Sequence, residues 1–217
     1  MTGATPQPLW RYRHVRSRDD GTTLTELLVV CALLGVVLGA AWMLMDATRE
    51  MSNYVEAKAQ VSDETRVALD RITTEIRQAA EPTGREGSGV FSEIATGAVG
   101  FFSDIDGDAQ LERVVYRRTG TKLTKSVTEP TIVDGVYTYG AEGPAKTMVS
   151  GLRPDWSDPI FTYWSRTSPP AQVAPADMAL VSSVSIHIRN SATVGRRTAY
   201  SDLQTWVKVR SVFNSVS

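Results

Sequence analysis

The sequence contains little of the chemistry that metalloproteins and disulfide-stabilised domains depend on. Its 217 residues include one cysteine and two histidines. A disulfide within the chain needs two cysteines, so the single Cys31 excludes it, and it equally excludes a zinc site built from cysteines. Cys31 lies inside an apolar run, where we expect it to serve as a small packing residue.

The chain also lacks an excess of charge of either sign. It carries 23 lysines and arginines against 24 aspartates and glutamates, a net charge of −1. This balance gives no electrostatic reason to expect the chain as a whole to bind nucleic acid. The length fits one modest domain with appendages better than a two-domain enzyme.

Catalytic motifs are missing as well. There is no Gly-x-Ser-x-Gly sequence, and the glycines between 84 and 89 are not followed by the Gly-Lys-Ser/Thr of a phosphate-binding loop. His187 would need a nucleophile and an acid beside it, and its place in an alternating pattern predicts an exposed side chain on the polar face of a strand. We therefore expect no enzyme, no catalytic residue and no bound cofactor.

Proline is absent from Leu9 to Glu81, so one long helix can run through most of this region. Its first part, 22–45, contains the apolar run Leu24–Met45, which as a helix is about 33 Å long and can cross a bilayer. The sequence therefore predicts a single membrane-spanning helix over 22–45.

One carboxylate, Glu26, stands at the start of this run. A carboxylate at the centre of a membrane helix costs about 2.5–3.5 kcal/mol and less near its end, and such a residue usually has a partner. Glu26 is therefore a candidate functional residue. The alternative is that it lies at the membrane edge and reaches water.

The residues around Glu26 carry a resemblance. A basic segment ends at Gly21, five residues before Glu26, and Glu26-Leu-Leu-Val-Val30 opens the apolar run. This pattern resembles the leader and first helix of type IV pilins and of the pseudopilins of type II secretion. The resemblance implies a cytoplasmic leader, 1–21, that a prepilin peptidase removes by cutting between Gly21 and Thr22. Thr22 stands where the family usually has phenylalanine, and it would be the residue that receives the family's N-methyl group.

The resemblance also implies the partners and the location. The first helix would bind other pilins or pseudopilins, the inner-membrane assembly platform and the lipid bilayer, and the filament would leave the cell surface. Four arginines precede the apolar run, which independently predicts a cytoplasmic N-terminus and an extracytoplasmic head. Those arginines are Arg11, Arg13, Arg16 and Arg18.

Two alternatives remain open for the N-terminal region. An ordinary secretory signal shares the basic start and apolar centre, and its cleavage site would lie near Gly39-Ala-Ala-Trp42. An uncleaved, single-pass, membrane-anchored binding protein would keep its first residues and would not assemble. The N-terminus of the mature protein distinguishes all three.

An amphipathic continuation of the helix is expected over 46–81, ended by Pro82 and the glycines that follow. Apolar residues recur there at steps of three and four, namely Val61, Ala68, Leu69, Ile72, Ile76 and Ala79. The charged residues expected on the remaining faces are Asp63, Glu64, Arg66, Asp70, Arg71, Glu75 and Arg77. The stripe should pack on the domain that follows.

The remainder, 82–217, predicts an extracytoplasmic β-rich head. The expected strands are 99–102, 113–118, 131–133, 135–139, 159–165, 184–188 and 202–212, with a proline-containing loop over 167–175. The fold class is therefore α+β, a long N-terminal helix packed on a C-terminal antiparallel sheet, which is also what the resemblance implies. Four segments further resemble minor pilins of the J/W type: the acidic turn near 104, Glu112-Arg-Val-Val-Tyr116, an expected strand Lys122-Leu-Thr-Lys125, and Phe161-Thr-Tyr-Trp164.

The acidic turn is a weak calcium candidate, because Asp104, Asp106 and Asp108 offer oxygen ligands. Compared with an EF-hand loop, Ala109 stands where glycine belongs and Val115 where a bidentate glutamate belongs. A plain turn between two strands accounts for the same residues.

Two side-chain sets could bind partners. The aromatic residues Tyr163, Trp164, Trp156 and Trp206 could form an exposed patch or pack in the core. The cations Arg196, Arg197, Lys208 and Arg210 could capture DNA or form a solvated face. The sequence leaves both alternatives open.

Overall fold

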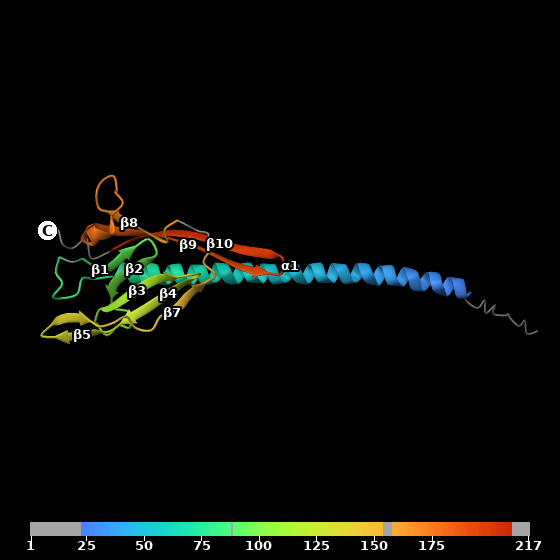
Figure 1. Ribbon diagram of the computed structural model, residues 1–217, viewed down its shortest axis with the longest axis horizontal. Helices are drawn as coiled ribbons and strands as arrows, with labels where there is room; N and C mark the ends of the chain where they lie inside the picture. The colour runs from blue at the N-terminus through green and yellow to red at the C-terminus, as the bar shows by residue number, and fades with distance from the viewer. Residues whose placement is uncertain (1–22, 88, 154–157, 210–217) are drawn as a thin grey trace, which may run out of the picture. The chain divides into compact units, whose positions relative to one another are not determined.

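The structure is a computed structural model that describes residues 23–87, 89–153 and 158–209. The predicted leader 1–21, the cleavage residues Gly21 and Thr22, and the side chains of Trp156 and Arg210 lie outside these residues. The chain divides into two compact units, Met1–Thr48 and Arg49–Ser217, which are described separately. One helix followed by antiparallel sheets gives an α+β fold, as the sequence predicts (Figure 1).

The helix α1 runs from Leu24 to Gln78 without interruption, in agreement with the absence of proline. Thr23 caps its start, since its Oγ1 accepts the amide of Glu26 at 3.3 Å. The helix ends three residues before the predicted position 81. The amide of Ala80 instead donates to the carbonyl of Phe102 at 2.9 Å, so the chain leaves the helix to pair with a strand ahead of Pro82.

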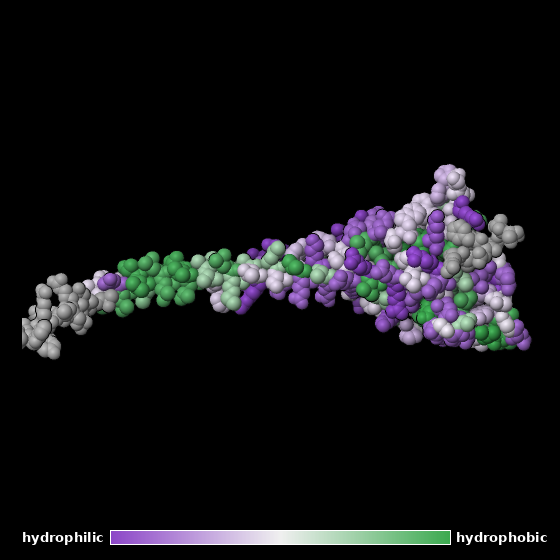
Figure 2. Space-filling view, turned by 180° about the vertical axis from the view of Figure 1, so that it is seen from behind, coloured by the Kyte–Doolittle hydropathy of each residue, from purple (hydrophilic) through white to green (hydrophobic). Residues whose placement is uncertain are grey.

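The first unit contains the apolar part of α1. Every side chain from Thr23 to Thr48 is exposed within the unit, and Figure 2 shows the apolar residues gathered along this stretch. By length and composition this helix can cross a membrane.

In the second unit, one face of α1 is buried from Val61 onward. The six apolar residues predicted to form the packed stripe are all buried, and the most exposed of them, Leu69, is 7% exposed. Figure 1 shows strands alongside this part of the helix. The predicted amphipathic continuation is thus confirmed.

The head contains three antiparallel sheets where one was expected. The five-stranded sheet has the order β1-β2-β3-β4-β7, the three-stranded sheet the order β10-β9-β8, and β5 and β6 form a hairpin. The strands are β1 (Phe91–Ala95), β2 (Ala98–Ser103), β3 (Glu112–Thr119), β4 (Lys122–Thr128), β5 (Pro130–Val133), β6 (Val136–Tyr139), β7 (Lys146–Ser150), β8 (Phe161–Ser165), β9 (Val181–Val194) and β10 (Arg197–Lys208). A short 3₁₀ helix, η1 (Pro175–Leu180), precedes β9.

One hydrophobic core joins α1 to both larger sheets. Ile72 and Ile76 of the helix have no exposed surface, and neither do Phe101 of β2 and Ile186 of β9. The alternation predicted over 184–188 holds for its apolar members, since Val184, Ile186 and Ile188 are all fully buried. The sheets are therefore held together through the helix as well as at their edges.

Candidate functional site

The N-terminal candidate is the exposed apolar surface of α1 with Glu26 at its beginning. Glu26 is exposed, and within the described residues no side chain forms an ion pair with it. No lysine or arginine occurs between Thr22 and Thr48. Within the first unit, a lysine or arginine that pairs with Glu26 can therefore come only from the residues before Thr22. Any other cationic partner lies outside this unit.

A second carboxylate of α1, Glu75, has the opposite surroundings. The sequence predicted it on the solvent-facing side, but its side chain is 9% exposed. Its Oε1 accepts a hydrogen bond from Lys125 Nζ at 2.6 Å, and its Oε2 accepts one from Tyr116 OH at 2.7 Å. Arg71, one turn earlier on the helix, donates to Oε1 at 2.9 Å. The prediction for Glu75 was wrong because Tyr116 of β3 and Lys125 of β4, together with Arg71 of the helix itself, bind its carboxylate.

The pKa values of two partners of Glu75, Lys125 and Tyr116, are shifted. Burial lowers the pKa of Lys125, although the hydrogen bond and the charge of Glu75 oppose that effect. Burial and the Glu75 carboxylate raise the pKa of Tyr116 far above its ordinary value. The Tyr116 phenol therefore stays neutral at neutral pH, and its hydrogen bond and the Lys125–Glu75 contact tie the end of α1 to two neighbouring strands.

Glu64 makes a similar connection three turns earlier and was also predicted to face solvent. Its Oε1 accepts the amide of Ser150, in β7, at 2.7 Å. Its Oε2 accepts Asn190 Nδ2, in β9, at 3.1 Å, and Asn190 is fully buried. One helical carboxylate thus contacts both larger sheets. For these buried charged contacts, the sequence offers a sign only at Lys125. It follows Leu123 by two residues in the same strand, so the two side chains lie on the same, buried face.

The acidic turn lies between β2 and β3, as predicted. One carboxylate oxygen from each of Asp104, Asp106 and Asp108 lies within 4.8 Å of the other two. Asp104 accepts the amides of Gly107 and Ala109 at 2.7 and 3.0 Å, which fixes the turn. Among the described residues, no lysine or arginine pairs with these three aspartates.

Glu112 lies directly after this turn and is fully buried. Its Oε2 accepts the amide of Ile105, inside the turn, at 2.8 Å. Its Oε1 is also buried and has no hydrogen-bond partner among the described residues. Burial raises the pKa of Glu112, and the negative charge of Asp106 adds to this shift. A buried polar atom without a partner costs about 1–3 kcal/mol.

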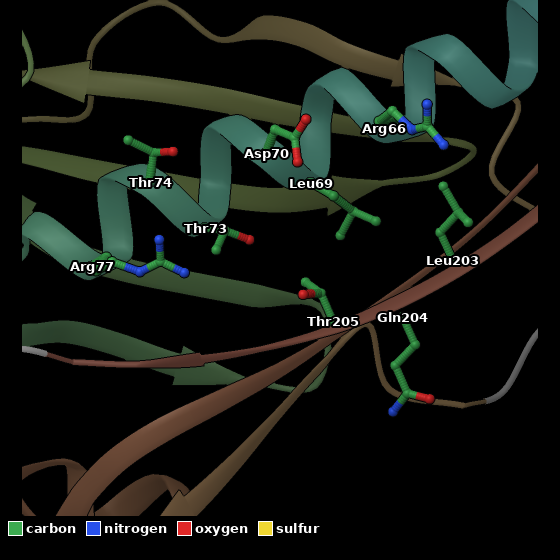
Figure 3. Close-up of a pocket in the computed structure, with 9 residues that line it drawn as sticks. All are labelled: Arg66, Leu69, Asp70, Thr73, Thr74, Arg77, Leu203, Gln204 and Thr205. Atoms are coloured by element: carbon green, nitrogen blue, oxygen red, sulfur yellow. The ribbon is translucent and has the colours of Figure 1, made fainter.

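A groove of about 430 Å³ lies between α1 and β10 (Figure 3). Leu203 and Thr205 of β10 point toward the helix, whereas Gln204 points away and donates to Ser185 Oγ at 3.0 Å. From α1 the groove is lined by Arg66, Leu69, Asp70, Thr73, Thr74 and Arg77. Among the described residues no strand pairs with the outer edge of β10, so a backbone edge and two arginines border this groove.

His187 is less exposed than predicted. Its side chain is 21% exposed, and Nε2 lies 2.6 Å from Asp202 Oδ1 on the neighbouring strand. Arg189 Nε donates to the other oxygen of Asp202 at 2.7 Å. Partial burial raises the pKa of Asp202, but these two hydrogen bonds outweigh it and lower the pKa overall. The histidine thus belongs to a cross-strand polar group on the outer face of the sheet.

The aromatic set divides between core and surface. Tyr163 is buried, and its hydroxyl donates to the carbonyl of Ala98 at 2.6 Å. Trp164 and Trp206 stack with ring centroids 5.2 Å apart, and Trp206 is 54% exposed. Of the two alternatives left open by the sequence, core packing applies to Tyr163 and surface exposure to Trp206.

The basic set is not gathered into one patch. Arg197, at the start of β10, lies 3.8 Å from Glu50 of α1 and stacks over Tyr54. Lys208 is at the other end of the same strand, about 36 Å away at roughly 3.3 Å per residue. The described part of the chain therefore offers no compact cationic surface from Arg196, Arg197 and Lys208.

Comparison with known proteins adds no identification. No family model matches the chain, and a search of curated proteins finds no significant match.

Proposed function

We propose that this chain is a minor pilin or pseudopilin that assembles through the first part of α1. The observation that carries the proposal is the exposed apolar surface from Leu24 to Met45, which belongs to an uninterrupted helix and has one carboxylate near its start. None of the described residues of the unit, 23–48, covers this surface, and exposed apolar surface in water is unfavourable by about 25 cal/mol per Å². Lipid or other helices must cover it.

Glu26 makes a purely lipidic covering costly. Cleavage after Gly21 would create a positive amine at Thr22, about one helical turn from Glu26. In a bundle of such subunits, the amine of a neighbour or of the same chain neutralises the carboxylate. An unpaired carboxylate in that bundle costs several kcal/mol, so the pair favours one axial register between neighbouring subunits.

The proposal includes the processing and the location. A prepilin peptidase removes residues 1–21, the head stays outside the cytoplasmic membrane, and an inner-membrane platform builds the filament. The likeness of several head segments to minor pilins of the J/W type supports a place at the filament tip. The helix carboxylates Glu64 and Glu75 support a head that moves as one body with the second part of α1.

The test is the N-terminus of the mature protein recovered from membranes. The proposal expects Thr22. It also expects Gly21→Leu to accumulate as full-length precursor, because a side chain at this position blocks close approach of the backbone to the peptidase. Gly35→Leu is the matched control, since an added Cβ there meets no atom within 4 Å. Normal processing of Gly21→Leu, an intact Met1 or a start beyond Ala41 would each refute the proposal.

The second candidate function is an uncleaved membrane-anchored binding protein. The groove between α1 and β10 favours it, because an unpaired strand edge beside a cleft is a place where an extended peptide can add. This candidate expects an intact Met1 in the membrane fraction. It also expects no co-purification with other helical membrane subunits.

A further inference from the structure

The turn between β2 and β3 concentrates negative charge that the described residues do not neutralise. Asp104, Asp106 and Asp108 each bring one oxygen within 4.8 Å of the others. Three carboxylates this close repel one another, and no described cation pairs with them. An acidic turn alone is common on protein surfaces, so the argument depends on what lies beneath it.

Beneath the turn lies Glu112, whose carboxylate is fully buried and only half satisfied. One oxygen holds the turn through the amide of Ile105 at 2.8 Å, and the other has no partner. Because Ile105 stands between Asp104 and Asp106, this bond keeps the carboxylate against the inner side of the acidic turn. Glu112 is not among the residues whose oxygens lie within 4.8 Å of one another, so a cation bound to the turn would reach the free oxygen through one water.

We propose that this turn is a calcium site, in which Asp104, Asp106 and Asp108 bind the ion and Glu112 completes the site from the buried side.

The spacing of the oxygen donors fits calcium. Counting Asp104 as the first position, the aspartates stand at the first, third and fifth positions of a calcium loop, where side-chain ligands occur. The carbonyl of Gln110 stands at the seventh position, and Glu112 at the ninth, where the ligand often acts through water. Asp104 and Asp108 accept amide hydrogens, but each carboxylate oxygen keeps a further lone pair for a metal.

Ala109 removes one objection raised by the sequence. It occupies the sixth position, where such loops have glycine, and its φ is +66°. The backbone therefore adopts the left-handed conformation that the sharp turn needs, in spite of the side chain. The second objection remains, since Val115 at the twelfth position lies within β3 and supplies no ligand.

The donor set also selects the ion. All donors are oxygens, which suits calcium better than zinc, and calcium accepts irregular coordination more readily than magnesium, which demands near-octahedral geometry. Without the bidentate glutamate, the site should bind weakly. We expect a dissociation constant on the order of 10⁻⁴–10⁻³ M, the range of extracellular calcium modules.

The experiment uses the full chain in detergent, stripped of metal with a chelator and then titrated with calcium chloride. The unfolding temperature should rise with the logarithm of the calcium concentration above the dissociation constant, by about 3–6 °C at ten times that constant. Magnesium chloride at the same concentrations should give a clearly smaller shift. No upward shift up to about 10 mM calcium, ten times the highest dissociation constant expected here, or an equal shift with magnesium, would overturn the site.

Variants assign the ligands. Asp106→Asn and Asp108→Asn should each weaken calcium binding at least tenfold. Glu112→Gln keeps the bond to Ile105 but removes the buried charge, so it should raise the unfolding temperature in chelator and reduce the added shift from calcium. Asp134→Asn is the control, because Asp134 is an exposed aspartate in the β5–β6 turn. A calcium response in Asp106→Asn/Asp108→Asn equal to that of the unaltered chain would also overturn the proposal.

Discussion

Glu26 and Glu75 stand on the same helix, one at the start of an entirely exposed apolar stretch and the other buried against β3 and β4. The chain itself supplies Glu75 with a lysine, an arginine and a tyrosine, whereas no described residue pairs with Glu26. The difference separates two tasks along α1. From Val61 onward the helix packs on its own chain, whereas no described residue covers its first part, and we propose that lipid or other molecules do so.

The largest effect is expected from breaking the buried pair. Lys125→Met leaves the Glu75 carboxylate buried without its closest cation, and such changes typically cost about 3–5 kcal/mol of unfolding free energy. Denaturant unfolding of the full chain in detergent measures the loss. Arg71→Gln is the control, because the Arg71 side chain is 50% exposed and its pairing should contribute less than about 1 kcal/mol.

A double variant separates charge from packing. Glu75→Gln with Lys125→Met removes both charges and keeps an acceptor for the Tyr116 hydroxyl. It should be more stable than Lys125→Met alone, because no unpaired charge stays buried. If Lys125→Met costs no more than Arg71→Gln, the contrast between the two parts of α1 loses its electrostatic basis.

A smaller effect should come from a buried polar group that has a neutral partner. Tyr163 is buried, its hydroxyl donates to a backbone carbonyl, and burial raises its pKa well above the usual value. The folded state therefore keeps this proton when the unfolded chain loses it. The associated stability is fully present below about pH 10 and falls above it, by up to about 1.4 kcal/mol per pH unit.

Unfolding measured between pH 8 and pH 11 tests this expectation. Tyr163→Phe should cost about 1 kcal/mol at pH 8, from the lost hydrogen bond, and should make the decline above pH 10 less steep. Tyr200→Phe serves as the control, because Tyr200 is 55% exposed. An unchanged decline in Tyr163→Phe would mean that other groups account for the alkaline instability, and Tyr116 and Tyr139 are the nearest candidates, since their pKa values are also raised.

Much of this fold could be predicted because periodicity reports directly on burial. All six apolar residues of the predicted stripe are buried, and the alternation of Val184, Ile186 and Ile188 places them in the core. The helix ends at Gln78 and not at 81 because the amide of Ala80 donates to the carbonyl of Phe102, in β2, and not to a helix carbonyl. Such a pair joins residues distant in sequence, and no local pattern reveals it.

The charged contacts could not be predicted for the same reason. Glu64 and Glu75 look like ordinary surface residues of a helix until Ser150, Asn190 and Lys125 are brought against them. The strand expected at Lys122–Lys125 is the first part of β4, whereas β1 and β7 were missed because their apolar alternation is short. The acidic turn was visible in the sequence, but the half-satisfied Glu112 beneath it is a property of the fold alone.

The smallest effect on stability is expected at Glu26, and it is the sharpest test of the comparison. Glu26→Gln and Glu26→Val should change the unfolding free energy of the head by less than about 0.5 kcal/mol, as for other exposed positions. Both should leave membrane insertion intact. They should nevertheless reduce co-purification with neighbouring helical subunits from sheared or detergent-solubilised filaments, because the carboxylate that pairs with a neighbour's amine is gone. Glu56→Gln, on an exposed part of α1 outside the apolar run, should co-purify as the unaltered chain does. If Glu26→Val also does so, Glu26 is not a docking group, and the carboxylate near the start of the apolar run lies at the membrane edge in contact with water.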